Sequence, residues 1–109
     1  MPGRPGDVGA MLISQLETLA GPDIRILLKK EKPWASITFS GTRHYLIIDA
    51  TGNGGVQSMN RFIKRLPDQV FDLPDHFIAD LLIRDPAPGD QEVMLEILTI
   101  IDPVARPES

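Results

Sequence analysis

WASITFSGTRHYLIID, residues 34–49, alternates between apolar and polar side chains on both sides of Gly41-Thr42. Two alternating runs joined by a glycine-containing pair are typical of a β-hairpin. With Gly41-Thr42 as the loop, three cross-strand pairs share one face, so the register and the hydrophobic pattern agree. The pairs expected on this core face are Phe39 with His44, Ile37 with Leu46, and Ala35 with Ile48.

Helical spacing and further alternation continue on both sides of this segment. Apolar residues at three- and four-residue spacing predict one helix over 8–20, capped by Asp7, and a second over 56–66, ended by Pro67. Residues 77–84 fit a strand better than a helix begun at Pro74, although both bury apolar side chains. The expected strands are 24–28, 34–40, 43–49, 77–84 and 92–101, with a short bridging strand at Val70-Phe71.

This order, α-β-β-β-α-β-β, predicts an α+β fold with a mostly antiparallel five-stranded sheet and two helices on one face. The chain has 109 residues, enough for one domain, which we expect to span 7–102 between disordered ends at 1–6 and 103–109. The chain has no cysteine, no apolar run long enough to span a bilayer and no signal-peptide pattern at its start. We therefore expect a cytoplasmic protein without membrane contact.

Charge is distributed unevenly along the chain. The net charge is −4, but residues 24–66 hold eight basic and two acidic side chains, whereas residues 67–109 hold ten acidic and two basic ones. A basic segment can indicate an anionic partner, including nucleic acid. The simpler interpretation is that the two halves interleave in the fold and their charges cancel, so nucleic acid is disfavoured but left open.

The glycine-rich loop after residue 50 is a candidate anion site. Gly52, Asn53, Gly54 and Gly55 join a strand to a helix, where free N–H groups and the helix dipole attract anions. Arg61 and Lys64 follow in that helix and add positive charge. The loop matches neither the P-loop nor the dinucleotide-binding fingerprint, so a plain connection is the competing interpretation.

No pattern in the sequence indicates catalysis or metal binding. His44 and His76 have no second histidine at ligand spacing, and no serine lies in a nucleophile motif. We therefore expect no catalytic residues, no metal and no cofactor. A protein that is not an enzyme fits the sequence better than an enzyme, although the question stays open.

The face of the hairpin away from the predicted core holds the only tryptophan and the only tyrosine of the chain. An uncovered aromatic and basic face is typical of a partner site, whereas a face under a helix is simply core. A homodimer would cover this face, another protein could also bind it, and single-stranded nucleic acid is the third alternative. The candidate interaction residues are Arg25, Leu27, Trp34, Arg43, Tyr45 and Ile47. The sequence thus favours a small protein-interaction module acting as a homodimer, with the anion or nucleotide site as the alternative.

Overall fold

The computed structural model describes residues 8–52, 54–84 and 92–102. Its elements follow one another in the order α-β-β-α-β-β, with a short 3-10 turn after the second helix. The bounds are α1 Val8–Ala20, β1 Ile24–Ala35, β2 Ser40–Ala50, α2 Gly55–Arg65, η1 Leu66–Asp68, β3 His76–Arg84 and β4 Glu92–Ile101.

The four strands form one antiparallel sheet in the order β1-β2-β4-β3. The α+β class, the antiparallel sheet and the two helices are confirmed, but the prediction of five strands is wrong. The strand predicted at 24–28 and the first two residues of the strand predicted at 34–40 belong to the single strand β1, whereas residues 36–39 form the reversal and Ser40 begins β2. Pro33 does not end this strand, because β1 lies at the edge of the sheet, where a missing N–H donor interrupts no ladder.

The predicted hairpin exists, but its predicted loop and register are wrong. Gly41 and Thr42 lie inside β2, and the chain reverses at residues 36–39, where the Ser36 N–H donates to the Phe39 carbonyl over 2.8 Å. Ala35 pairs with Ser40. Ile37, predicted to be core, is fully exposed at the tip.

Gly41 serves close packing of strands rather than a turn. A Cβ on Gly41 would collide with the carbonyl oxygen of Thr99, and it would lie 2.9 Å from Cα of Ile100. Both atoms belong to β4, the neighbour of β2. Any side chain at position 41 would therefore push β2 and β4 apart.

The remaining predicted elements differ in outcome. The helix over 8–20 is confirmed as α1, and the helix over 56–66 is confirmed as α2, shifted by one residue. The strand preferred over a helix at 77–84 is confirmed as β3, and the last strand is β4. Residues 70–71 form no strand. The ends predicted to be disordered lie outside the described residues.

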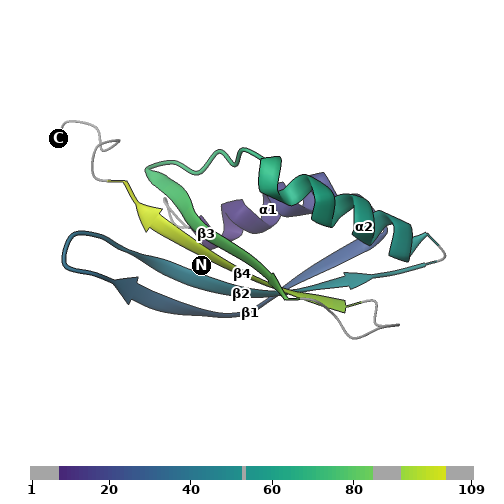
Figure 1. The fold of residues 1–109 in the computed structure, drawn as a ribbon, viewed down its shortest axis with the longest axis horizontal. Helices are drawn as coiled ribbons and strands as arrows, with labels where there is room; N and C mark the ends of the chain where they lie inside the picture. Colours follow the sequence, from purple (N-terminus) through teal and green to yellow (C-terminus); the bar gives the residue numbers. More distant parts are fainter. Residues whose placement is uncertain (1–7, 53, 85–91, 103–109) are drawn as a thin grey trace.

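Both helices lie on the same side of the sheet, so the molecule has two layers (Figure 1). Leu12 and Leu16 of α1 and Phe62 of α2 are buried against the sheet. From the sheet, the fully or nearly fully buried side chains of this core include Leu46, Ile48, Val93, Leu95 and Ile97. Every second residue of β2 and β4 therefore points toward the helices, as the alternation of a half-buried strand requires.

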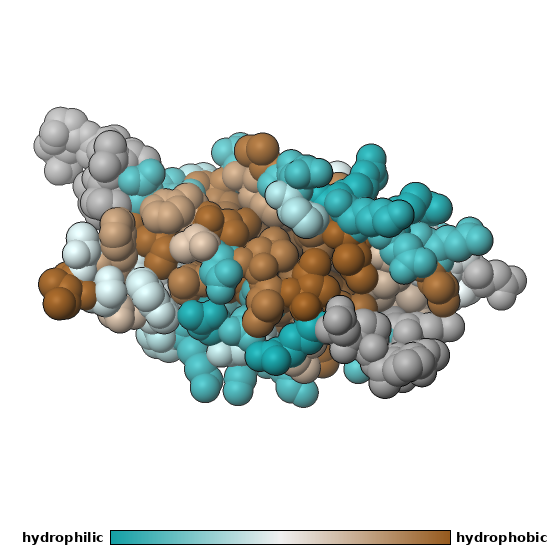
Figure 2. Space-filling view, in the orientation of Figure 1, coloured by the Kyte–Doolittle hydropathy of each residue, from teal (hydrophilic) through white to brown (hydrophobic). Residues whose placement is uncertain are grey.

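The core is less completely enclosed beside β3. Ile78, Leu81 and Ile83 of β3, together with Ile63 and Phe71, are only partly buried against the core. Figure 2 shows a hydrophobic patch in the middle of the side on which β3 and α2 are nearest the viewer, with hydrophilic surface above and below it.

Candidate protein-interaction surface

The sheet face opposite the helices, here called the open face, has no described helix over it (Figure 1). Strand alternation and register place its side chains in rows that cross the sheet. One such row runs from Leu27 through Ile47 and Met94 to Arg84. The next row contains Lys30, Tyr45, Glu96 and Leu82.

The structure brings all six predicted interaction residues onto the open face. Leu27 is 51% exposed, and Tyr45 and Ile47 beside it are half-buried. Arg25 donates to Asp49 over 2.9 Å on the neighbouring strand. Trp34 lies opposite Gly41 toward the far end of the face, and Arg43 lies between the two aromatic residues. The predicted face is thus a single continuous surface, although the pairing of its strands differs from the predicted one.

β4 also buries apolar side chains on the open face, where no described helix covers it (Figure 1). Leu98 and Ile100 point away from the helices, yet they are 6% and 2% exposed. Leu98 lies between Arg43 and Asp80 in its row, and Ile100 lies between Gly41 and Phe77. Phe77 in turn makes an edge-to-face contact with Phe39, with ring centroids 6.4 Å apart. One end of the open face therefore has a small apolar cluster of its own, and no helix is needed to bury β4 there.

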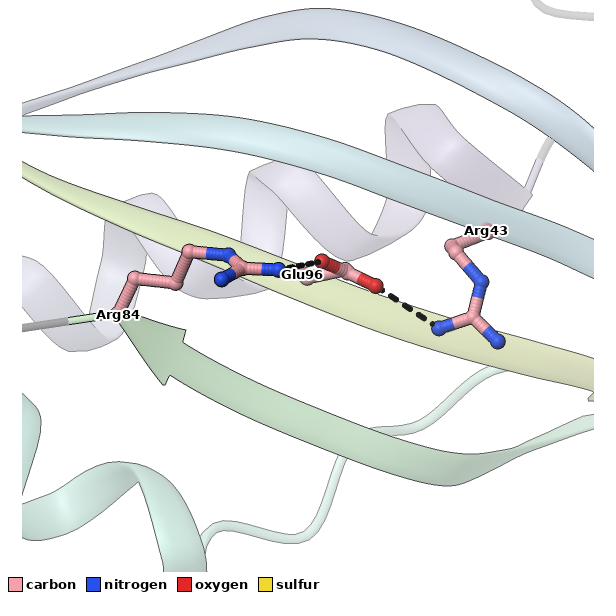
Figure 3. A network of polar contacts seen from close by, with 3 residues as sticks. All are labelled: Arg43, Arg84 and Glu96. Carbon is pink, nitrogen blue, oxygen red and sulfur yellow. Dashed lines mark hydrogen bonds and ion pairs between the residues drawn. The ribbon is translucent and has the colours of Figure 1, made fainter.

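A three-residue ionic network occupies the middle of the open face (Figure 3). Arg43 donates to one carboxylate oxygen of Glu96 over 3.0 Å, and Arg84 donates to the other over 3.4 Å. The side chain of Glu96 is only 12% exposed. Because a poorly solvated carboxylate needs partners, the two guanidinium groups stabilise it and connect β2, β4 and β3.

A shallow depression of about 260 Å³ lies beside this network. It is lined by Lys29, Lys30, Tyr45, Arg84, Met94 and Glu96. A β-bulge between Leu28 and Lys30 leaves Lys29 without a partner in β2, so two consecutive lysines line the same depression. The Nζ atom of Lys30 lies 5.2 Å from the centroid of the Tyr45 ring, a cation–π distance. The depression can therefore accept an acidic group.

The glycine-rich loop lies elsewhere, at the start of α2. Gly52 has a φ of 75°, which favours glycine, and Asn53 lies outside the described residues. Gly54 is the N-cap of α2, and a Cβ on Gly55 would lie 2.9 Å from the Ala50 Cβ. Gly55 thus packs closely against the end of β2.

An acidic side chain of the protein itself lies at this helix end. Asp23 accepts a hydrogen bond from the Ser58 hydroxyl over 3.2 Å, and Arg61 donates to the same hydroxyl over 3.3 Å. Lys64 lies in the last turn of α2, at the far end from the loop. A bound anion would share this region with the carboxylate of Asp23 and would lack Lys64 as a neighbour, so the anion site stays a prediction.

The sequence patterns missed a buried polar chain on the core face. His44 is fully buried, its Nδ1 lies 2.7 Å from Glu31, and its Nε2 lies 2.8 Å from the Thr99 hydroxyl. The order carboxylate, imidazole, hydroxyl resembles a nucleophilic triad in its connectivity. Thr99 is 0% exposed, however, so a substrate cannot reach its hydroxyl. The contacts among Glu31, His44 and Thr99 therefore satisfy buried polar groups. The partners are 13 and 55 residues apart in the sequence, so no short-range pattern indicated these contacts.

The described residues contain neither a metal-ligand cluster nor a membrane-spanning helix. No group of three or more histidine, cysteine or acidic side chains in the described ranges is placed to hold a metal ion. No described helix is long and apolar enough to cross a bilayer. His76 lies 2.8 Å from the Pro74 carbonyl through its Nδ1.

Comparisons with protein-family models, with curated proteins and with solved structures found no match to this chain. The function must therefore be inferred from the surface itself.

Proposed function

We propose that the protein is a non-enzymatic protein-interaction module that binds a second copy of itself through the open face. The observation that carries this proposal is the exposure of large apolar side chains on a sheet face that no described helix covers. Leu27, Met94, Leu82 and Phe77 are 51%, 38%, 44% and 40% exposed there. Apolar side chains grouped on one face in this way are typical of partner surfaces.

The distribution of charge on the open face supports a second copy as the partner. The charged side chains that β1 contributes to this face are all basic, namely Arg25, Lys29, Lys30 and Lys32. From β3 and β4 it receives three acidic side chains and one basic one, namely Asp80, Glu92, Glu96 and Arg84. A two-fold axis parallel to the strands lays β1 of each copy over β3 and β4 of the other. This packing places opposite charges against each other, and its two-fold symmetry limits the contact to two copies.

The size of the face indicates a weak dimer. Four strands lie about 4.8 Å apart, and each contributes a stretch of roughly eight residues with a rise of about 3.3 Å per residue. The face therefore covers about 500 Å² per copy. Two copies would thus bury roughly 1,000 Å², close to the lower limit for a specific interface. We therefore expect association that depends on protein concentration.

The test is the solution mass at increasing protein concentration, measured by light scattering behind a sizing column. The chain mass is 12.0 kDa, and we expect the wild type to rise toward twice that value or above. Leu27→Glu should lower the mass, because it replaces an exposed apolar side chain of the open face with a carboxylate. Val56→Glu is the matched control, because Val56 is 52% exposed on α2, away from the open face. A wild type that stays monomeric, or an unchanged mass for Leu27→Glu, contradicts the proposal.

A further inference from the structure

The two outer strands of the sheet differ in how they protect their free edges. An outer strand has a row of main-chain N–H and C=O groups without a strand partner, and such an edge pairs readily with another chain. β1 carries the devices that prevent pairing, with a bulge at Lys29, Pro33 in the strand, and Lys29, Lys30 and Lys32 along it.

β3 lacks these devices over most of its length. Its bulge lies between Ile78 and Asp80, and residues 80–84 then pair with β4 without interruption. The sequence of this regular part is Asp80-Leu81-Leu82-Ile83-Arg84, in which Leu82 is 44% exposed. Among the described residues, no strand pairs with this apolar and regular edge, which lies on the side of the sheet opposite β1.

We propose that β3 pairs with β3 of a second copy, antiparallel and centred on Leu82. In this register Leu82 lies opposite its own copy, and residues equally distant from it lie opposite each other. Asp80 of each copy then faces Arg84 of the other, which forms two symmetric pairs of opposite charge. The five residues are thus complementary to themselves.

The other side of the strand supports the same partner. Leu81 and Ile83 point toward the helix layer and are only partly buried. In the proposed register Leu81 lies opposite Ile83 of the second copy on that side. The hydrophobic patch beside β3 in Figure 2 would then continue across the two-fold axis instead of facing water.

Edge pairing and open-face packing are geometrically independent. Pairing through β3 uses an axis perpendicular to the sheet, so both copies keep their helices on one side and join their open faces into one eight-stranded surface. If both contacts form, the axis through the open face and the axis beside β3 do not meet, so the contacts link copies into a row instead of a closed tetramer. If one contact fails, the other still yields a dimer.

Charge reversal tests the edge register directly. Asp80→Arg sets like charges opposite each other at both ends of the contact, and so does Arg84→Asp. Each variant alone should have a lower mass than the wild type, whereas an equimolar mixture should recover the wild-type mass, because every opposed pair then has opposite charges. Recovery in the mixture also shows that both variants are folded. Wild-type mass for either single variant, or no recovery in a mixture of two folded variants, overturns the proposal.

Cysteine crosslinking tests the centre of the register. The chain has no cysteine, and residues opposite each other in an antiparallel pair have Cα atoms about 4.5–5.5 Å apart, within disulfide range. Leu82→Cys should give a crosslinked dimer under mild oxidation, whereas Asn60→Cys, at an exposed position of α2, should stay uncrosslinked. Equal crosslinking of the two variants contradicts pairing at Leu82.

The two proposals can fail separately. The side chains of Asp80 and Arg84 also border the open face, so their charge-reversal variants can affect both contacts. Leu27→Glu removes only the open-face packing. Leu82→Cys should therefore still crosslink in the Leu27→Glu background. Loss of that crosslink in a folded protein overturns the edge contact as an independent one. A dimer in which Leu27→Glu has no effect and Leu82→Cys crosslinks would leave only the edge contact.

Discussion

Arg43 and His44 are neighbours in β2, but they point to opposite faces of the sheet and into different surroundings. His44 is fully buried on the core face, and its two ring nitrogens have single, short contacts with Glu31 and Thr99. Arg43 lies on the open face, where it shares Glu96 with Arg84, and the side chain of Arg84 is 60% exposed. The comparison teaches that one strand contributes a fully buried polar contact to the core face and a partly exposed ionic network to the open face.

The largest expected difference between the faces concerns neighbouring residues of β4. Leu95→Ala should lower the free energy of unfolding by about 2–5 kcal/mol, because it opens a cavity among fully buried side chains. Met94→Ala, on the open face and 38% exposed, should lower it by less than about 1 kcal/mol in the monomer. Urea unfolding followed by circular dichroism measures both values. Similar losses for the two variants would show that the open face is as enclosed as the core.

A smaller effect is expected from the buried polar chain. Thr99→Val removes the hydroxyl that contacts His44 and leaves a buried ring nitrogen without its partner, which should reduce stability by about 1–3 kcal/mol. His44→Phe should also reduce it, because the Thr99 hydroxyl then keeps only its 3.4 Å hydrogen bond to the Thr42 carbonyl. The double variant should lose less than the sum of the two single variants, since both partners are then apolar. Purely additive losses in this double-mutant cycle would mean that the two groups do not interact.

The smallest expected effect concerns the exposed ion pair on the open face. Arg25→Ala removes the contact with Asp49, and the side chains of this pair are 63% and 29% exposed. Exposed ion pairs contribute about 0.2–1 kcal/mol, and salt screens them, so the loss of stability should be small and should shrink further at about 1 M salt. Unfolding at low and high salt gives the comparison. A loss that persists at high salt would indicate that Arg25 contributes through packing of its aliphatic part.

Local patterns predicted most of the secondary structure, and the errors have specific physical causes. Helical spacing located α1 and α2, and alternation located β2, β3 and β4. The errors arose at Pro33 and Gly41, two residues that usually indicate a turn. Pro33 is tolerated because β1 is an edge strand, and Gly41 is required because β4 lies close to it. Neither reason can be read without the order of the strands.

The candidate surface was predictable in part for the same reason. Alternation placed Arg43, Tyr45 and Ile47 on one face, since side chains two residues apart in a strand share a face, and the predicted hairpin placed Trp34 on the same face. The depression beside them depends on the bulge at Lys29 and on Arg84 and Glu96 from β3 and β4. A bulge reverses the alternation of a strand, and no short-range pattern indicated this one.

The sequence by itself determined both helices, most of the strand residues, the antiparallel class of the sheet, and which side chains of β2 share a face. These properties depend on neighbours within a few residues along the chain. The tertiary structure alone decided that β2 and β4 are central, that β1 and β3 are free at the edges, and that Glu31, His44 and Thr99 meet. These properties depend on contacts between residues far apart in the sequence, whose spacing has no period to detect.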